Sequence, residues 1–247
     1  MLLRRITKHV KEQNWFAVLL DFLIVVFGIF VGLQVDNWNE ERKSRVEEGD
    51  YLLRLSEDAS GSIAQGQFGR DFIIQGADRA GVVLRALDEC RVDPESRVDF
   101  ANGLYHLGKL FPPYMVTGTI DELRSTGKLA IFESTDIRDQ MNATLREFDT
   151  AYLIYTDAEA RTREHVFYVD SKVVYRIEGP QVGDTEIAWE AVEIDIDTAC
   201  QDDRFYTAVA AVRNYAYDIA ARHEHMLVVM NAFKSAVDEE LDKQAKP

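Results

Sequence analysis

The stretch Trp15–Val35, WFAVLLDFLIVVFGIFVGLQV, is a long apolar run near the N-terminus of this 247-residue chain. It contains one ionisable side chain, Asp21, and no Lys or Arg. A helix of about 20 apolar residues crosses the ~30 Å hydrocarbon core of a bilayer, and Trp15 and Trp38 flank the stretch as interfacial anchors do. A cleavable signal peptide is the competing interpretation, but its apolar region would be shorter, and no small-x-small cleavage site follows in LQVDNWN. We therefore predict an uncleaved transmembrane helix over residues 15–35.

Residues 1–14 are predicted to form a basic amphipathic segment that lies in the headgroup region before the span. Against one acid, Glu12, this segment carries four basic residues: Arg4, Arg5, Lys8 and Lys11. The numbers of Lys and Arg close to the span are equal on its two sides, so the orientation depends on this uncompensated N-terminal charge. We predict a cytoplasmic N-terminus and a C-terminal domain outside the cytoplasm, which in a bacterium is the periplasm.

Four residues of the span share one helical face, because their spacing is i, i+4, i+7 and i+11: Asp21, Val25, Gly28 and Gly32. The two glycines form a G-x-x-x-G pair, which lets a second helix approach closely, and an ionised carboxylate inside a bilayer usually faces protein or water. The pattern predicts association with a second copy or with a partner transmembrane helix. Two alternatives stay open: a boundary aspartate beside incidental glycines, and handling of protons or ions by Asp21.

Two patches carry a more specific pattern. The first consists of Gly28-Ile29, Leu33-Gln34 and Asn37-Trp38-Asn39-Glu40-Glu41-Arg42, and the second of Thr119-Ile120-Asp121-Glu122-Leu123-Arg124-Ser125-Thr126-Gly127-Lys128-Leu129. Together they resemble a family of uncharacterised bacterial single-pass membrane proteins, whose span ends I-G-I-x-x-x-L-Q-x-x-N-W-N-E-E-R and has an acidic residue near its start. The resemblance implies a membrane-anchored helical protein in the bacterial inner membrane, and it supplies no catalytic residues.

The rest of the chain, residues 36–247, is predicted to form one acidic helical domain. It holds 24 of the Lys and Arg residues against 41 of the Asp and Glu residues, a net charge of −17. Such a surface repels phosphate backbones, so nucleic acid is not an expected partner. The helical pattern continues past Asp36, and the glycines at 61, 66 and 69 leave open a kink or reversal there.

Two long segments carry the spacing of a coiled-coil seam, with residues alternately four and three positions apart. The first, capped at Ser134 or Thr135, has the stripe Met141, Leu145, Phe148, Tyr152, Tyr155, Glu159, Thr162, Val166, Val169 and Val173. The second begins near Asp203 and has the stripe Phe205, Val209, Val212, Ala216, Ile219, His223, Met226, Met230, Phe233 and Val237. We predict an all-α fold, in which the transmembrane helix continues into an elongated antiparallel helical bundle with coiled-coil-like packing.

Each stripe is interrupted by polar residues, Glu159 and Thr162 in the first and His223 in the second. If the first helix runs to about residue 177 and the second begins at Asp203, antiparallel pairing brings these three side chains within half a turn of one another. We predict that they form a polar layer that fixes the register of the bundle. A ligand-binding or pH-sensing role for His223 stays open as an alternative.

The connection between these helices contains VEIDID, residues Val192–Asp197, which alternates as a half-buried strand does but has no evident partner strand. Its three acids are not followed by the Asx and Gly of a calcium loop, so a solvated face is expected rather than a metal site. The two cysteines, Cys90 and Cys200, are compatible with one disulfide or with two free thiols. A disulfide requires the loop at residue 90 and the 178–202 connection to meet at one end of the bundle.

The sequence contains no H-E-x-x-H, no C-x-x-C, no P-loop, no dinucleotide-binding pattern and no Glu-x-x-His pair of a di-iron bundle. We therefore expect no enzyme, no cofactor and no metal. The leading hypothesis is a non-enzymatic, membrane-anchored oligomerisation, scaffold or sensor module whose partners are the lipid bilayer and a second copy or partner transmembrane helix. The alternative is an accessory subunit of an ion-driven membrane complex that uses the intramembrane Asp21.

Overall fold

The computed structural model describes residues 15–177 and 186–245, apart from the side chains of residues 15–18 and of Asp21. The predicted basic segment 1–14 lies outside the described residues. The chain divides into two compact units, with the boundary between Asp50 and Tyr51. One helix, α2 (Trp15–Asp88), contributes to both units, so the predicted continuation of the N-terminal helix into the domain is confirmed. The glycines at 61, 66 and 69 cause no reversal.

The first unit is helical over its described residues, and its described side chains from Leu19 to Val46 are exposed. They include large apolar groups such as Phe22 and Phe27, which are 63% and 69% exposed. An α-helix that is apolar all round is stable only in apolar surroundings.

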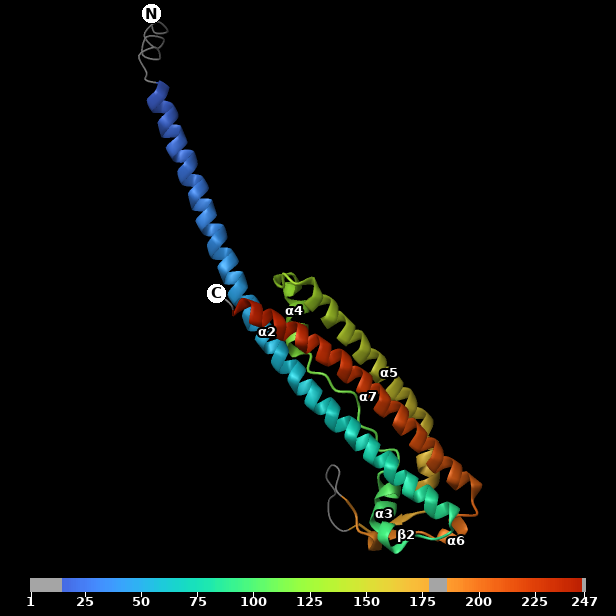
Figure 1. Ribbon diagram of the computed structural model, residues 1–247. Helices are drawn as coiled ribbons and strands as arrows, with labels where there is room; N and C mark the ends of the chain where they lie inside the picture. Colours follow the sequence, from blue (N-terminus) through green and yellow to red (C-terminus); the bar gives the residue numbers. More distant parts are fainter. Residues whose placement is uncertain (1–14, 178–185, 246–247) are drawn as a thin grey trace, which may run out of the picture. The chain divides into compact units, whose positions relative to one another are not determined.

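The second unit is a bundle built on three long helices: α2 from Tyr51 onward, α5 (Thr135–Asp170) and α7 (Asp203–Gln244). Helix α7 runs antiparallel to both of the others (Figure 1). Between α2 and α7, Ser56 donates a hydrogen bond to Asp238, and Tyr217 donates one to Asp78. Between α5 and α7, Glu147 pairs with Arg222, and Glu164 pairs with Arg204. The predicted all-α class and antiparallel bundle are confirmed.

Because α7 is antiparallel to both α2 and α5, those two helices are parallel, and the chain must travel back along the bundle between them. After α2 come a short turn, η1 (Pro94–Ser96), and helix α3 (Arg97–Tyr105). The return is then made by residues 106–117, which we call the strap; Figure 1 shows its extended part as the thin green line beside α2. Residues 106–108 form a turn, and the extended part of the strap is residues 109–117. An extended chain advances ~3.3 Å per residue against ~1.5 Å in a helix, so this part covers the length of about 20 helical residues.

The strap ends at α4 (Gly118–Ser125), which is followed by the turn η2 (Lys128–Ile131). Thr117 occupies the cap position, but its side chain makes no capping hydrogen bond. Asp58 of α2 replaces it, accepting a 3.3 Å hydrogen bond from the backbone N–H of Thr119, so a carboxylate of one helix stabilises the N-terminus of another.

The predicted seam of α7 is confirmed at all ten positions, each of which is buried. The predicted seam of α5 is confirmed at Met141, Thr162 and Val169. Between them it is displaced by one residue, because the buried positions include Thr144, Ala151 and Ala158. Tyr152, expected in the seam, is 48% exposed. Small side chains let α5 approach α7 closely, and the larger aromatic residues flank the contact instead of filling it.

Between α5 and α7, at the end of the bundle where α2 stops, the chain forms four short elements. These are a two-stranded antiparallel sheet of β1 (Val174–Tyr175) and β2 (Val192–Glu193), the turn η3 (Trp189–Ala191) and a single turn of helix, α6 (Ile196–Ala199). The predicted strand Val192–Asp197 is present over Val192–Glu193 and differs from the prediction in two respects. It has a partner, and it ends early, because the Asp195 carboxylate accepts a hydrogen bond from the backbone N–H of Thr198 and caps α6.

Candidate functional site

The predicted association face of the span is exposed in the first unit. Val25 is 59% exposed, and a Cβ added at Gly28 or Gly32 would meet no atom within 4 Å. Gly28 and five neighbouring residues line a shallow, almost wholly apolar hollow: Leu23, Ile24, Val26, Phe27 and Phe30. The side chain of the fourth predicted residue, Asp21, lies outside the described residues.

Among the described residues, one helix is long and apolar enough to cross a membrane, and it is α2. Its most apolar window has a mean hydropathy of 1.5, and none of that window is buried. A signal sequence near an N-terminus can also meet these criteria of length and composition. The described residues therefore contain one N-terminal apolar helix of a kind that fits either a membrane span or a signal sequence.

The predicted polar layer of Glu159, Thr162 and His223 is not formed. Glu159 is exposed and lies 3.8 Å from Arg163 of its own helix. The Thr162 hydroxyl is buried, but it donates to the backbone carbonyl of Ala158, also in its own helix, at 2.8 Å. His223 faces other elements altogether.

The cause is the register between α5 and α7. Glu147 lies within 3.3 Å of Arg222 and 3.5 Å of His225, which places His223 across from Glu147 instead of Glu159. These two α5 positions are about 18 Å apart along the helix axis. The expected pairing required α5 to continue to about residue 177, whereas it ends at Asp170.

His223 is fully buried where three segments meet: α7, α2 and the strap. Its Nε2 lies 3.1 Å from the carbonyl oxygen of Phe111 in the strap, so the neutral tautomer with a proton on Nε2 donates a hydrogen bond there. Gly69 of α2 lies beside both residues. A Cβ at Gly69 would come within 2.5 Å of the Phe111 ring and 3.1 Å of the His223 ring, so this crossing requires glycine.

We expect the bundle to lose stability in acid through His223. Burial lowers the pKa of His223 from its ordinary value of 6.5, and the carbonyls of Phe111 and Gly66 oppose only part of that effect. The unfolded chain then binds a proton at a higher pH than the folded chain does. The free energy of unfolding therefore falls as the pH drops from 6.5 through the lower folded value.

The variant His223→Gln keeps a hydrogen-bond donor for Phe111 but does not titrate. In chemical denaturation of the full chain in detergent, its unfolding midpoint should change less than that of the wild type between about pH 7 and about pH 5. Identical pH profiles for the two proteins would show that His223 does not contribute to the acid sensitivity.

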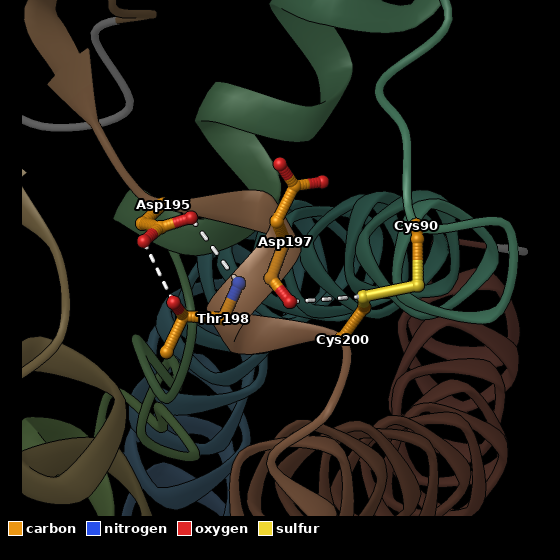
Figure 2. Close-up of a disulfide and its surroundings, with 5 residues drawn as sticks. All are labelled: Cys90, Asp195, Asp197, Thr198 and Cys200. Carbon is orange, nitrogen blue, oxygen red and sulfur yellow. Dashed lines mark hydrogen bonds between the residues drawn. A yellow bond between two sulfur atoms is a disulfide. The ribbon is translucent and has the colours of Figure 1, made fainter.

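The structure joins Cys90 and Cys200 by a disulfide, with the Cα atoms 5.3 Å apart (Figure 2). The predicted meeting of the loop at residue 90 with the 178–202 connection is thus present. Cys90 follows α2 in a left-handed conformation, φ +47°, and Arg91 donates its backbone N–H to the carbonyl of Ala86 to close the helix end. Cys200 follows α6, with its Sγ 3.4 Å from the carbonyl oxygen of Asp197.

The acids near the disulfide have local partners. Arg176 pairs with Glu193 and holds the pKa of the Glu193 carboxyl below its usual value. Figure 2 shows Asp195 turned toward Thr198, whose hydroxyl donates to it at 2.7 Å, and this bond lowers the pKa of Asp195. Within residues 15–177 and 186–245, no three His, Cys, Asp or Glu side chains gather as a metal site requires.

Another buried polar group is the hydroxyl of Tyr175, which has no hydrogen-bond partner among the described residues. The Tyr175 ring packs edge-on against Tyr105, whose own ring lies under the Lys109 ammonium at 3.3 Å. Burial, with the negative charge of Asp170 adding to it, raises the pKa of Tyr175. A phenol held protonated in this way can donate a hydrogen bond but does not act as a general base.

Comparisons of the chain with protein-family models, with curated proteins and with solved structures found no match. The family resemblance of the two patches therefore stays a prediction. In the structure, the first patch lies on the exposed part of α2. The second patch forms α4 and the start of η2, where Ile120 and Leu123 are buried and Glu122 accepts a hydrogen bond from Tyr51 of α2.

Sequence patterns missed the strap and the aromatic residues that lie beside it. The Phe111-Pro112-Pro113 run indicated only that a helix stops there. A usable signal was present, however, in the distribution of charge: residues 59–69 and 110–120 contain no charged side chain, although 29% of the chain is charged.

Proposed function

We propose that this protein is a non-enzymatic, single-pass membrane protein that holds an acidic helical domain outside the cytoplasm and acts by associating with a second copy of itself, as an oligomerisation, scaffold or sensor module. The observation that carries the proposal is the uninterrupted exposure of the apolar side chains described between Leu19 and Val35. Water would make that surface costly, at roughly 25 cal/mol for each Å² of apolar area, and a bilayer removes the cost.

An uncleaved anchor is favoured over a signal sequence by the continuity of α2. The helix extends from the apolar stretch through residues 36–50 to buried core positions such as Leu52 and Leu55 without interruption. A signal peptidase cleaves extended chain after small residues, and the segment that follows Val35 provides neither.

The orientation is supported by the Cys90–Cys200 disulfide in the second unit. Disulfides persist in oxidising compartments, such as the bacterial periplasm, and are rare in the cytosol. A domain outside the cytoplasm agrees with the uncompensated basic residues of the N-terminal segment.

The association face of the span can be tested with bulky residues. In the variant Gly28→Leu/Gly32→Leu, close approach of a second helix is blocked, so the crosslinked dimer recovered from membranes should decrease about tenfold, equivalent to ~1.4 kcal/mol. Val26→Leu, roughly 130° around the helix from this face, is the matched control and should leave the dimer unchanged. An unchanged dimer in the glycine variant would exclude this face.

Gentle crosslinking of the tagged full-length protein in membranes, followed by purification, would identify the partner and the stoichiometry. Recovery of a membrane complex that conducts ions, with a flux lost in Asp21→Asn, would replace this proposal with that of an accessory subunit. Digestion of the domain by protease added to intact spheroplasts tests the orientation, and protection of the domain there would reverse it.

A further inference from the structure

A hollow of about 610 Å³ lies along α2 in the second unit. Helix α2 lines it from Asp71 to Arg85, while α7 contributes Arg213 and α3 contributes Asp99. Sites for small molecules have volumes of about 300 to 1,000 Å³, so the hollow has the size of such a site. None of the site residues predicted from the sequence lies in it.

Arg213 crosses α2 at Gly81, on one side of this hollow. Its Nε donates a 3.2 Å hydrogen bond to the carbonyl oxygen of Ala77, and its guanidinium lies 5.0 Å from the centre of the Tyr217 ring. A Cβ at Gly81 would come within 3.3 Å of that Nε. Glycine inside a helix is less stable than alanine, but here its missing Cβ leaves room for the guanidinium. Arg213 is therefore held in place by the fold before any ligand binds.

Six charged side chains line the hollow, and three of them are in ion pairs. Asp71 pairs with Arg70 at 2.9 Å, and Arg79 pairs with Asp99 at 3.3 Å. Within residues 15–177 and 186–245, the other three have no group of opposite charge within 4 Å: Asp78, Arg85 and Arg213. The hollow thus contains unpaired charges of both signs.

These three side chains keep polar groups available for a ligand. The Asp78 carboxylate accepts a hydrogen bond from the hydroxyl of Tyr217 at 2.6 Å, and that donor is neutral. Arg213 uses two of its five N–H donors, toward Ala77 and Tyr217. In the described part of the chain, Arg85 donates no hydrogen bond at all.

The unpaired charges are arranged along one face of α2. Asp78 and Arg85 are seven residues apart, so they project from the same side of the helix, about 10 Å from each other along its axis. Gly81 lies between them, and Arg213 crosses there. A ligand in the hollow therefore meets a carboxylate toward one end and two guanidinium groups toward the other.

This arrangement fits a small molecule that carries charges of both signs. A guanidinium binds a carboxylate through two parallel hydrogen bonds, and an unpaired aspartate binds an ammonium group. A doubly charged phosphate fits less well, because Asp78 and the net charge of −17 on residues 36–247 both repel it. The ligand that matches these charges is an amino acid.

We propose that the hollow binds a free amino acid, with its carboxylate held by Arg85 and Arg213 and its ammonium group held by Asp78. This inference goes beyond the proposed function, since it gives the second unit a ligand, and it does not depend on the association of the span. It supplies a signal that the module can sense.

The first test is the unfolding temperature of the full-length protein in detergent, measured with each of the standard amino acids in turn. A ligand that binds only the folded state raises this temperature, so at least one amino acid should do so at about 10 mM. For that amino acid, the derivative with an amidated carboxylate and the derivative with an acetylated amine should each bind at least about tenfold more weakly. No shift with any amino acid, or equal binding of either derivative, would overturn the proposal.

The second test changes the hollow. By calorimetric titration, Arg85→Gln and Asp78→Asn should each raise the Kd of the amino acid at least about tenfold, the loss expected for one hydrogen bond between charged groups. Both variants should keep the unfolding midpoint, because Arg85 has no partner to lose and the amide oxygen of asparagine still accepts from Tyr217. Arg146→Gln, at an exposed position of α5, makes the same change of net charge and should leave the Kd unchanged. An unchanged Kd in Arg85→Gln and Asp78→Asn would place the binding elsewhere and contradict the proposal.

Discussion

Removing the Cys90–Cys200 disulfide is expected to lower the free energy of unfolding by about 4 to 5 kcal/mol, the value of the chain-entropy model for a loop of roughly 100 residues. The two cysteines are 110 positions apart, so the disulfide restricts much of the unfolded chain. It also ties the end of α2 to the segment that leads into α7. The measurement is denaturant unfolding of the oxidised wild type and of Cys90→Ala/Cys200→Ala, in the same detergent.

The variant Cys90→Gly/Cys200→Ala is the matched control. It lacks the disulfide too, but glycine adopts the left-handed conformation of residue 90, φ +47°, without the cost that a Cβ imposes. It should be more stable than Cys90→Ala/Cys200→Ala by roughly 1 kcal/mol, and still less stable than the wild type. Equal stability of the wild type and both double variants would show that the disulfide does not support the fold.

The periodicity of α7 could be predicted in full from the sequence, and the periodicity of α5 only in part. Helix α7 is buried against both α2 and α5, so its apolar stripe coincides with its contacts. In α5, large and small residues compete for the seam, and Ala151 is buried beside the half-exposed Tyr152. A hydrophobicity pattern ranks the tyrosine and the alanine similarly, whereas the distance between the helix axes favours the smaller side chain.

The register between α5 and α7, and the path of the chain between α2 and α5, could not be predicted from the sequence. The polar layer failed because the position of one helix against another depends on where each helix ends, and α5 ends at Asp170 with no proline or glycine beside it. The strap could not be predicted either, because the need for it arises from the parallel arrangement of α2 and α5. Local sequence carries no information on that arrangement.

The position of the disulfide, by contrast, could be related to the fold from the sequence. A covalent bond between Cys90 and Cys200 requires the two loops that contain these cysteines to lie at the same end of the bundle. In the structure these loops lie together. A pair of cysteines therefore constrained the arrangement of the helices more strongly than the proposed polar layer did.

Replacing Gly103 with alanine is expected to destabilise the second unit by about 3 kcal/mol, at the upper end of the usual cost of overpacking. Gly103 is buried in α3, and a Cβ there would lie 2.4 Å from the carbonyl oxygen of Arg79 and 2.8 Å from Val83 Cγ2. The first contact is with backbone inside α2, which cannot rotate away. Helix α3 must shift instead, and the shift disturbs the two hydrogen bonds of 2.9 Å and 3.0 Å that join Asn102 to the backbone of Ile187.

Gly76→Ala, in the same region of the bundle, distinguishes this steric effect from the general effect of changing a glycine. A Cβ at Gly76 meets no atom within 4 Å, and the residue lies inside α2, where alanine is favoured over glycine by roughly 0.5 to 1 kcal/mol. Unfolding measurements should therefore give opposite signs for the two substitutions. If Gly103→Ala were as stable as Gly76→Ala, α3 could not pack on α2 as closely as the structure has it, and the tip of the bundle would need a different arrangement.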